Sequence, residues 1–215
     1  MVLQESPYLY SATKRLMDII VSVFFLTVLS PIYIAVILAI FIQDGGCPVY
    51  IQRRVGKRRK NFDFIKFRSM VKNADDVLFS NEELYKKMRS GTHKVKDDPR
   101  ITKVGKFIRK YSVDELPQFV NVLRGEMSFV GPRALRPDEL AKFEKEHPEM
   151  KGFLKDVFKV KPGITGLWQV SGRSSINFVD RMKMDAFYAN NPSILRDFSI
   201  ILKTPIAVLK GEGVQ

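Results

Sequence analysis

Residues 19–42, IIVSVFFLTVLSPIYIAVILAIFI, form a run of 24 residues without a charged side chain, and this run decides the fold. A helix of this length can cross the roughly 30 Å hydrocarbon layer of a bilayer. A secretory signal peptide is the rival interpretation, but its apolar core is shorter and precedes a cleavage site of small residues. Asp44-Gly45-Gly46-Cys47-Pro48 is a poor cleavage site. We therefore expect a membrane segment.

A break is expected in the middle of this segment. Pro31 lacks an N–H and its ring clashes with the carbonyl of Thr27, so Ser30-Pro31 predicts a kink. Positive charge tends to stay on the cytoplasmic side, which favours a re-entrant hairpin if both flanks are basic. A kinked spanning helix is the alternative. Asp18, at the edge of the run, is expected near the headgroups or paired with a cation. The flanking cations are Lys14, Arg15, Arg53, Arg54, Lys57, Arg58, Arg59 and Lys60.

The charge balance favours an anionic partner. The chain of 215 residues has 36 Lys and Arg against 23 Asp and Glu, a formal net charge of +13. This surplus suits nucleic acid, phospholipid headgroups or a phosphorylated substrate, without choosing among them. Cys47 is the single cysteine, so an internal disulfide is excluded. The chain has two histidines, His93 and His147, which are far apart, so a usual zinc site is not expected.

Hydrophobic periodicity predicts a mainly α-helical fold with a small β-hairpin. Residues 48–51 and 62–67 have strand character and flank a turn near Gly56. Apolar stripes in the C-terminal third are either core or lie in the headgroup plane, and periodicity does not separate the two. Helices are expected over residues 72–90, 101–110, 117–123, 152–160, 177–190 and 193–210, the last with a break at Pro205.

Two adjacent carboxylates, Asp114 and Glu115, precede a predicted helix start. Ser112 and Glu115 have the spacing of a capping box, which gives a purely structural explanation. Pro117 weakens it, since its missing N–H falls where a capped helix needs a donor. The surrounding cations fit either solvated ion pairs or a site for a pyrophosphate. They are Lys66, Arg68, Arg100, Lys106, Arg109, Arg124 and Arg133.

Two loops rich in glycine and proline carry the remaining candidates, Gly131-Pro132-Arg133 and residues 161–173. Such loops bring backbone N–H groups close to phosphate oxygens, although most merely make turns.

Six motifs in this order resemble the bacterial sugar transferase family, the monotopic phosphoglycosyl transferases that prime glycoconjugate synthesis. The resemblance covers essentially the whole chain, and the combination is highly specific although no single motif is. The motifs are RVG at 54–56, KFRSM at 66–70, DPRIT at 98–102, DELPQ at 114–118, VGPR at 130–133 and KPGITGLWQ at 161–169.

The resemblance implies a ping-pong reaction. Asp114 is similar to the family's nucleophile, which attacks the sugar-bearing phosphate of a UDP-sugar, releases UMP and carries the phosphosugar until polyprenyl (undecaprenyl) phosphate attacks it. Glu115 is similar to the acid associated with Mg²⁺, the implied cofactor. The residues implied to bind phosphates and substrate are Lys66, Arg68, Arg100, Arg133, Arg173 and Asp185.

The resemblance also implies the organisation and location. Residues 1–45 are expected to form the re-entrant hairpin, broken at Ser30-Pro31. Residues 46–215 are expected to form a catalytic domain with interfacial helices on the cytoplasmic face of the bacterial inner membrane. Expected partners are the UDP-sugar, the lipid phosphate and phospholipids, with no nucleic acid; a homodimer is compatible with the pattern.

Some features bear on the substrate. Ala134 stands where the family commonly has proline, and Asn191-Pro192-Ser193 stands where it usually has an aromatic residue after the asparagine, so the resemblance does not define the detailed substrate contacts. The long stretch at residues 72–96 resembles hexose-1-phosphate transferases of exopolysaccharide and O-antigen synthesis. This favours galactose or glucose over an N-acetylated amino sugar.

Two rival functions are a basic membrane protein that binds nucleic acid or anionic lipid, and a structural partner of glycan-assembly enzymes. The first predicts that Asp114 is dispensable. The second predicts tight protein association without release of UMP.

Overall fold

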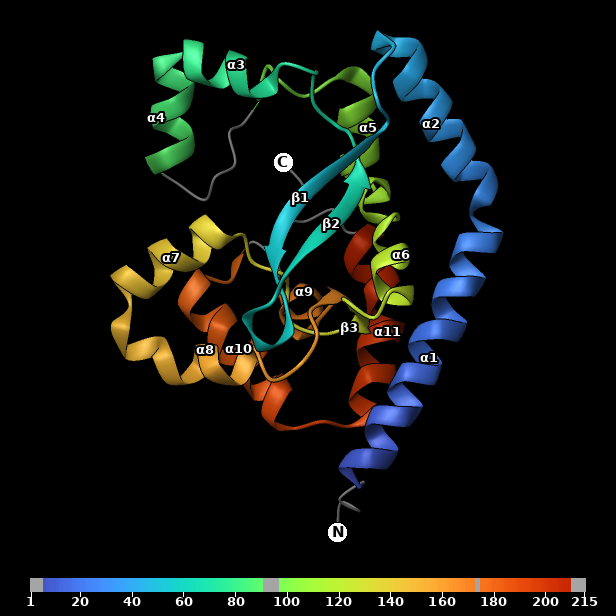
Figure 1. Ribbon diagram of the computed structural model, residues 1–215, viewed down its shortest axis with the longest axis vertical. Helices are drawn as coiled ribbons and strands as arrows, with labels where there is room; N and C mark the ends of the chain where they lie inside the picture. The colour runs from blue at the N-terminus through green and yellow to red at the C-terminus, as the bar shows by residue number, and fades with distance from the viewer. Residues whose placement is uncertain (1–5, 91–96, 173–174, 210–215) are drawn as a thin grey trace.

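The computed structural model describes residues 6–90, 97–172 and 175–209. Helices dominate this part of the chain, and the strands belong to two small two-stranded sheets (Figure 1). The predicted fold, mainly α-helical with a small β-hairpin, is therefore confirmed. The division at residue 45 into a membrane hairpin and a catalytic domain stays a prediction.

The predicted break separates α1 (Pro7–Val28) from α2 (Ser30–Asp44), which run along one side of the molecule (Figure 1). The two helices are bent by 60°, at the point where Pro31 has no N–H for the carbonyl of Thr27. Taken singly, none of the described helices has the length and apolar character needed to cross a bilayer. The bent pair together meets that criterion, by length and composition alone.

The predicted hairpin consists of β1 (Val49–Val55) and β2 (Asn61–Phe67), paired antiparallel from Val49 opposite Phe67 to Val55 opposite Asn61. The first strand extends four residues beyond the predicted end at residue 51, because its second half pairs with the start of β2. A 3-10 turn, η1 (Lys57–Arg59), connects the strands. The aromatic rings of Phe62 and Phe64 enter the core from β2.

A second sheet was not predicted. β3 (Ser128–Val130) and β4 (Gly163–Thr165) pair in parallel. The glycines that follow or begin these strands permit a close approach of the two backbones: a Cβ on Gly163 would lie 2.1 Å from the backbone nitrogen of Gly131. These glycines of the two Gly/Pro loops therefore pack the loops against each other, rather than forming open phosphate loops.

The other helices mostly lie where the pattern predicts them, with shifts of a few residues at their ends. Thr102 accepts a hydrogen bond from the N–H of Gly105 and so caps α5, and Asn177 caps α10 in the same way. The elements are α3 (Ala74–Ser80), α4 (Glu82–Ser90), α5 (Lys103–Lys110), η2 (Val113–Glu115), α6 (Gln118–Leu123), α7 (Pro137–Glu146), η3 (Pro148–Met150), α8 (Lys151–Val157), α9 (Leu167–Ser171), α10 (Phe178–Asn190) and α11 (Ile194–Leu209).

Three expectations about these helices were wrong or incomplete. Residues 72–90 form two short helices instead of one, and α7 was not predicted. The expected break at Pro205 does not occur, because α11 continues through it to Leu209. The hydroxyl of Thr204 donates to the carbonyl of Ile200 at 2.7 Å, and one missing N–H near the helix end does not stop the helix.

The inward face of α1 is hydrogen-bonded to the body of the protein. Arg15 donates to the carbonyl oxygens of Val122 and Leu123 at 2.6 and 2.8 Å. The carboxylate of Asp18 accepts from the Ser128 hydroxyl at 2.9 Å and from the next backbone N–H at 2.8 Å. Asp18 is only 2% exposed, and its expected place near the headgroups stays a prediction. Its charge is compensated by donors at β3.

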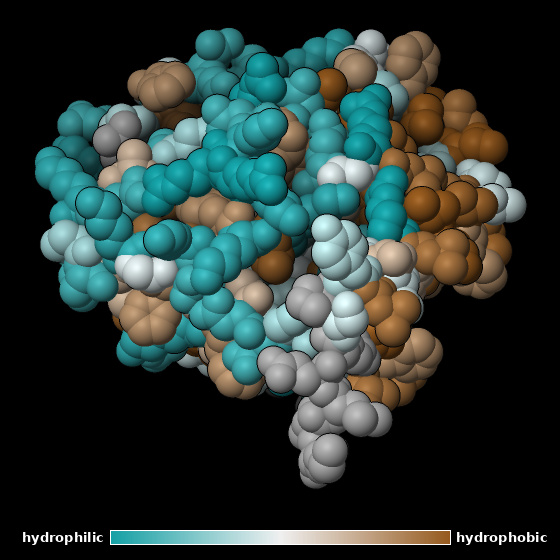
Figure 2. All heavy atoms as spheres, turned by 60° about the horizontal axis from the view of Figure 1, so that its bottom comes forward, coloured by the Kyte–Doolittle hydropathy of each residue, from teal (hydrophilic) through white to brown (hydrophobic). Residues whose placement is uncertain are grey.

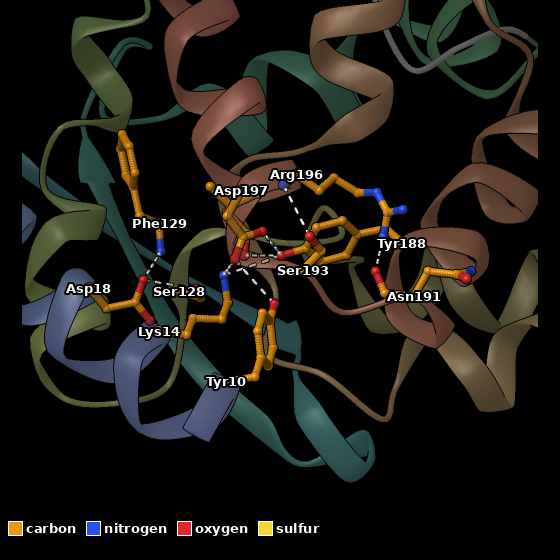
Figure 3. Close-up of polar contacts among 11 residues, drawn as sticks. Tyr10, Lys14, Asp18, Ser128, Phe129, Tyr188, Asn191, Ser193, Arg196 and Asp197 are labelled. Carbon is orange, nitrogen blue, oxygen red and sulfur yellow. Dashed lines mark hydrogen bonds and ion pairs between the residues drawn. The ribbon is translucent and has the colours of Figure 1, made fainter. Parts of the chain in front are cut away.

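A second buried contact joins α1 to α10 and α11 (Figure 3). Asp197 is fully buried and accepts from Lys14 at 2.8 Å, from the Tyr10 hydroxyl at 3.1 Å and from the Tyr188 hydroxyl at 2.6 Å. The N-terminal part of α1, just before the apolar run, is thereby held against two helices from the far end of the chain.

Large apolar side chains remain exposed on α1, α2, α5 and α11, and we call this surface the apolar face. Figure 2 shows apolar residues gathered along one side of the molecule. α11 packs beside α1, and α5 packs beside α2, so the four helices are neighbours. The residues include Ile20, Val23, Phe24, Val28, Ile34, Leu38, Phe41, Ile42, Phe107, Tyr111, Leu195, Phe198, Leu202 and Ile206.

Candidate active site

Asp114 and Glu115 lie in η2, between α5 and α6. The capping box that would have explained them is not formed, because Ser112 makes no capping hydrogen bond and lies in the left-handed region at φ 55°. α6 instead begins at Gln118, directly after Pro117. The capping box therefore does not account for the carboxylate pair, and the uncommon backbone conformation lies just before the pair, at Ser112.

The electrostatic environment makes Asp114 an unusual carboxyl group. Burial raises its pKa to about 7, and repulsion from Glu115 adds to the increase. The positive charges of Lys66 and Arg109 act in the opposite direction. Lys66, on β2, is partly buried, and the loss of solvent around it lowers its pKa, while Asp114 opposes that shift. A partly buried carboxylate between a like charge and two cations is typical of sites that handle charged substrates.

Glu115 faces a different cation. Its carboxylate lies 3.8 Å from a guanidinium nitrogen of Arg133, whose side chain remains 41% exposed. The guanidinium also lies 6.0 Å from the ring centre of Trp168. Arg133 is thus partly held in place, with donors left for a ligand.

A narrow cleft that opens to solvent lies beside Glu115, and its inner part, of about 10 Å³, has room for about one water-sized atom or molecule. Asp114 does not line the cleft, whereas Glu115, the next residue in the chain, does. The lining residues are Arg54, Phe64, Glu115, Gln118, Arg133, Ala134, Gly163, Ile164 and Gln169.

Two of the predicted phosphate-binding arginines are engaged elsewhere in this structure. Arg68 pairs with Asp44 at the end of α2. Arg100 is 6% exposed and pairs with Asp98, with contacts of 2.9 and 2.6 Å to the two carboxylate oxygens. Of the predicted cations, Lys66 and Arg133 are the ones whose charges act at the carboxylate pair.

Asp185 is 1% exposed and does not line the cleft. Burial raises its pKa to about 7, although Arg181, 3.6 Å away, and the backbone N–H of Arg133 oppose the shift. Arg181 in turn stacks on Trp168 at 4.7 Å. Asp185 therefore lies behind Arg133, and its predicted contact with substrate stays a prediction. Arg173 lies outside the described residues.

Three residues that the structure brings to the site were not among the predicted phosphate- and substrate-binding residues: Arg54, Arg109 and Gln118. Arg54 and Gln118 belong to motifs that carry the family resemblance, and Arg109 was one of many nearby cations. Motif membership was therefore the available signal for Arg54 and Gln118, whereas the effect of Arg109 on Asp114 follows from the fold.

The donor set is compatible with Mg²⁺. The described residues contain no cluster of three or more histidine, cysteine or acidic side chains suited to hold a metal. Mg²⁺, however, usually takes only one or two carboxylates and completes its shell with phosphate and water oxygens. The repulsion between Asp114 and Glu115 leaves oxygen ligands whose charge a cation would offset. The two carboxylates therefore fit the ion.

Comparison with known proteins supports an enzyme of one family. The model of a family described as "Bacterial sugar transferase" matches residues 9–211. "Exopolysaccharide production protein ExoY" of Sinorhizobium fredii is 40% identical over 205 residues, covering 94% of this chain and 87% of the relative.

Two further relatives are longer. "Undecaprenyl-phosphate galactose phosphotransferase" of Salmonella typhimurium is 42% identical over 93% of this chain and 41% of its own length. "UDP-N-acetylgalactosamine-undecaprenyl-phosphate N-acetylgalactosaminephosphotransferase" of Aeromonas hydrophila is 35% identical over 96% and 46%. The chain thus spans less than half of these two proteins. The matches favour an enzyme over the two non-catalytic alternatives, and the chain belongs to the bacterial sugar transferase family.

Proposed function

We propose that the protein transfers a hexose-1-phosphate from a UDP-sugar to undecaprenyl phosphate and releases UMP, as the first membrane step of glycan synthesis. The observation that carries the proposal is the partly buried Asp114 carboxylate, which lies in the field of Glu115 and of the cations Lys66 and Arg109. The names of the undecaprenyl-phosphate phosphotransferase relatives support the same donor and acceptor.

The reaction proceeds in two displacements. A carboxylate oxygen of Asp114 forms a bond to the sugar-bearing phosphorus, the bond from that phosphorus to the UMP oxygen breaks, and UMP leaves with the bonding electrons. An oxygen of undecaprenyl phosphate then attacks the same phosphorus, and the bond to Asp114 breaks. The products are undecaprenyl diphosphate sugar and the regenerated carboxylate.

The neighbouring residues offset charge during both steps. Lys66 and Arg109 reduce the repulsion between Asp114 and the approaching phosphate. Arg133 holds phosphate oxygens at the mouth of the cleft, and Asp185 positions Arg133 from behind. Glu115, with Asp114 beside it, would hold Mg²⁺, which supplies positive charge against the diphosphate.

A panel of UDP-sugars tests the reaction and the choice of sugar. With undecaprenyl phosphate present, we expect UMP release to be fastest with UDP-galactose or UDP-glucose and slower with the two N-acetylated amino sugars. Faster turnover of an N-acetylated sugar would change the substrate but keep the reaction class. Absence of UMP release from every donor would contradict the proposal.

We also propose that α1 and α2 enter one leaflet and turn back at Ser30-Pro31, with both ends on the cytoplasmic face. The 60° bend and the apolar face support this topology. The α11 side chains of the apolar face would then lie at the headgroups, which makes α11 an interfacial helix.

A labelling experiment tests the topology, because Cys47, just after α2, is free and exposed. We expect a membrane-impermeant maleimide to label Cys47 in inside-out vesicles and not in intact spheroplasts. A Cys47→Ser variant carrying Ser6→Cys, just before α1, should behave identically. Labelling of the two positions from opposite sides would establish a spanning segment instead.

A further inference from the structure

The cleft beside Glu115 contains two buried donors without a partner. Gln118 is 1% exposed, and its amide nitrogen Nε2 has no hydrogen-bond partner among the described residues. Arg54 is 8% exposed, and its Nε likewise has none within the described structure. Both residues line the cleft, although they come from different elements, α6 and β1. Two independent donors at one place indicate a ligand with acceptor oxygens.

Arg54 is fixed in this position by its other contacts. Its Nη1 donates to the carbonyl of Ala134 at 3.1 Å, and its Nη2 donates to the side-chain oxygen of Gln52 at 2.7 Å. The central carbon of its guanidinium group, Cζ, lies 5.2 Å from the centre of the Phe64 ring. The unpaired Nε therefore belongs to a rigid group, and a rigid donor binds a ligand with little loss of conformational entropy.

The charge around the cleft favours an anion. Burial and the nearby Arg133 lower the pKa of Arg54 to about 10, so it still carries its charge at neutral pH. Arg133 lines the same cleft and is only loosely paired with Glu115, at 3.8 Å. Burial of an unsatisfied donor destabilises a folded protein, unless a ligand supplies the missing acceptor.

We propose that Gln118 and Arg54 form a phosphate subsite, in which Gln118 Nε2 and Arg54 Nε donate to oxygens of a substrate phosphate. The inference rests on the proposed function for the identity of that phosphate. Because Asp114 does not line the cleft, we assign to the subsite a phosphate other than the one that Asp114 attacks. That phosphate is either the one that leaves with the nucleotide or the one on the lipid acceptor. Both offer anionic oxygens that accept hydrogen bonds.

The test is a Gln118→Met variant of the full chain in detergent, because Met keeps the shape of Gln and removes its donor. We expect the melting temperature without ligand to be unchanged or higher, since an unpaired buried donor is lost. Binding of UMP, measured by calorimetry, should weaken roughly 10- to 100-fold. Gln118→Glu should weaken it further by placing a carboxylate in the subsite. Gln43→Met, at the exposed end of α2, is the matched control and should leave UMP binding unchanged.

A soluble short-chain prenyl phosphate provides the second arm. Weakened UMP binding with unchanged prenyl phosphate binding assigns the subsite to the donor, and the reverse assigns it to the acceptor. Unchanged affinity for both ligands would overturn the subsite, and a lower ligand-free melting temperature would show that Gln118 is structural. Stabilisation by pyrophosphate, present in wild type and reduced in Gln118→Met, supports the subsite even if no UDP-sugar is turned over.

Discussion

Asp114→Asn should lower the rate of UMP release by at least ~10⁴-fold with the preferred UDP-sugar, because the neutral amide cannot form the acyl-phosphate bond. The variant retains the size of the side chain. In the wild type, the pKa of Asp114 is about 7, above the ordinary value of 3.8. The folded wild-type protein therefore loses stability as pH rises from about 4 to 7, because the unfolded chain ionises this carboxyl group more readily. The melting temperature of the variant at pH 8 should therefore equal or exceed that of wild type.

Glu115→Gln is the matched comparison for this experiment. It removes the neighbouring charge and the proposed oxygen ligand for Mg²⁺ but leaves the Asp114 carboxylate in place. We expect a smaller loss of rate than in Asp114→Asn, with greater dependence on Mg²⁺ concentration. A folded Asp114→Asn protein that retains a tenth of the wild-type rate would show that another group is the nucleophile.

Asp197→Ala should destabilise the protein by about 3–5 kcal/mol, because it removes one partner of a buried ion pair. Asp197 is fully buried and the Lys14 side chain is 14% exposed, so the variant leaves a cation without its counter-charge (Figure 3). The hydroxyls of Tyr10 and Tyr188 also lose their acceptor. For a chain of this size the melting temperature should fall by roughly 10 °C.

The double variant Lys14→Met with Asp197→Leu is the control for this prediction. It removes both charges together, so most of the lost stability should return. Thermal unfolding in one detergent, followed by circular dichroism, compares wild type and the two variants. An Asp197→Ala protein within about 0.5 kcal/mol of wild type, the range of ordinary surface substitutions, would show that this contact does not hold α1 to the body.

The sequence predicted those parts of the fold whose signals are local. Pro31 predicted the break between α1 and α2, and Thr102 and Asn177 stand at capped helix starts. The parallel pairing of β3 with β4 is not a local property, because each strand has three residues and they are far apart in the chain. α7 did have a readable signal: Pro137 begins it, and Glu139 accepts from the backbone N–H of Arg136 at 2.9 Å.

The site was predictable to a similar degree. The motifs brought together Asp114, Glu115, Lys66 and Arg133, which the structure also places close together. They did not show which cations are occupied by other partners. Arg68 and Arg100 pair with carboxylates outside this cluster, whereas Arg109 acts on Asp114. Such partners depend on tertiary contacts.

The roles of Gln118 and Arg54 also depend on tertiary contacts. Their motifs mark them as members of the site region, but only the fold shows that each is buried with a donor left unpaired. Burial of a polar group without a partner is a property of the packed structure. The phosphate subsite therefore could not be inferred from residue types and spacing.

The most direct test of the account is the mass of the peptide that contains Asp114. The purified protein is incubated with its preferred UDP-sugar in the absence of lipid acceptor, quenched and digested. We predict a mass increase of one hexose phosphate on this peptide, with one UMP released per chain, and loss of the adduct when undecaprenyl phosphate is added. Turnover without such an adduct, or an adduct on a different residue, would contradict the mechanism.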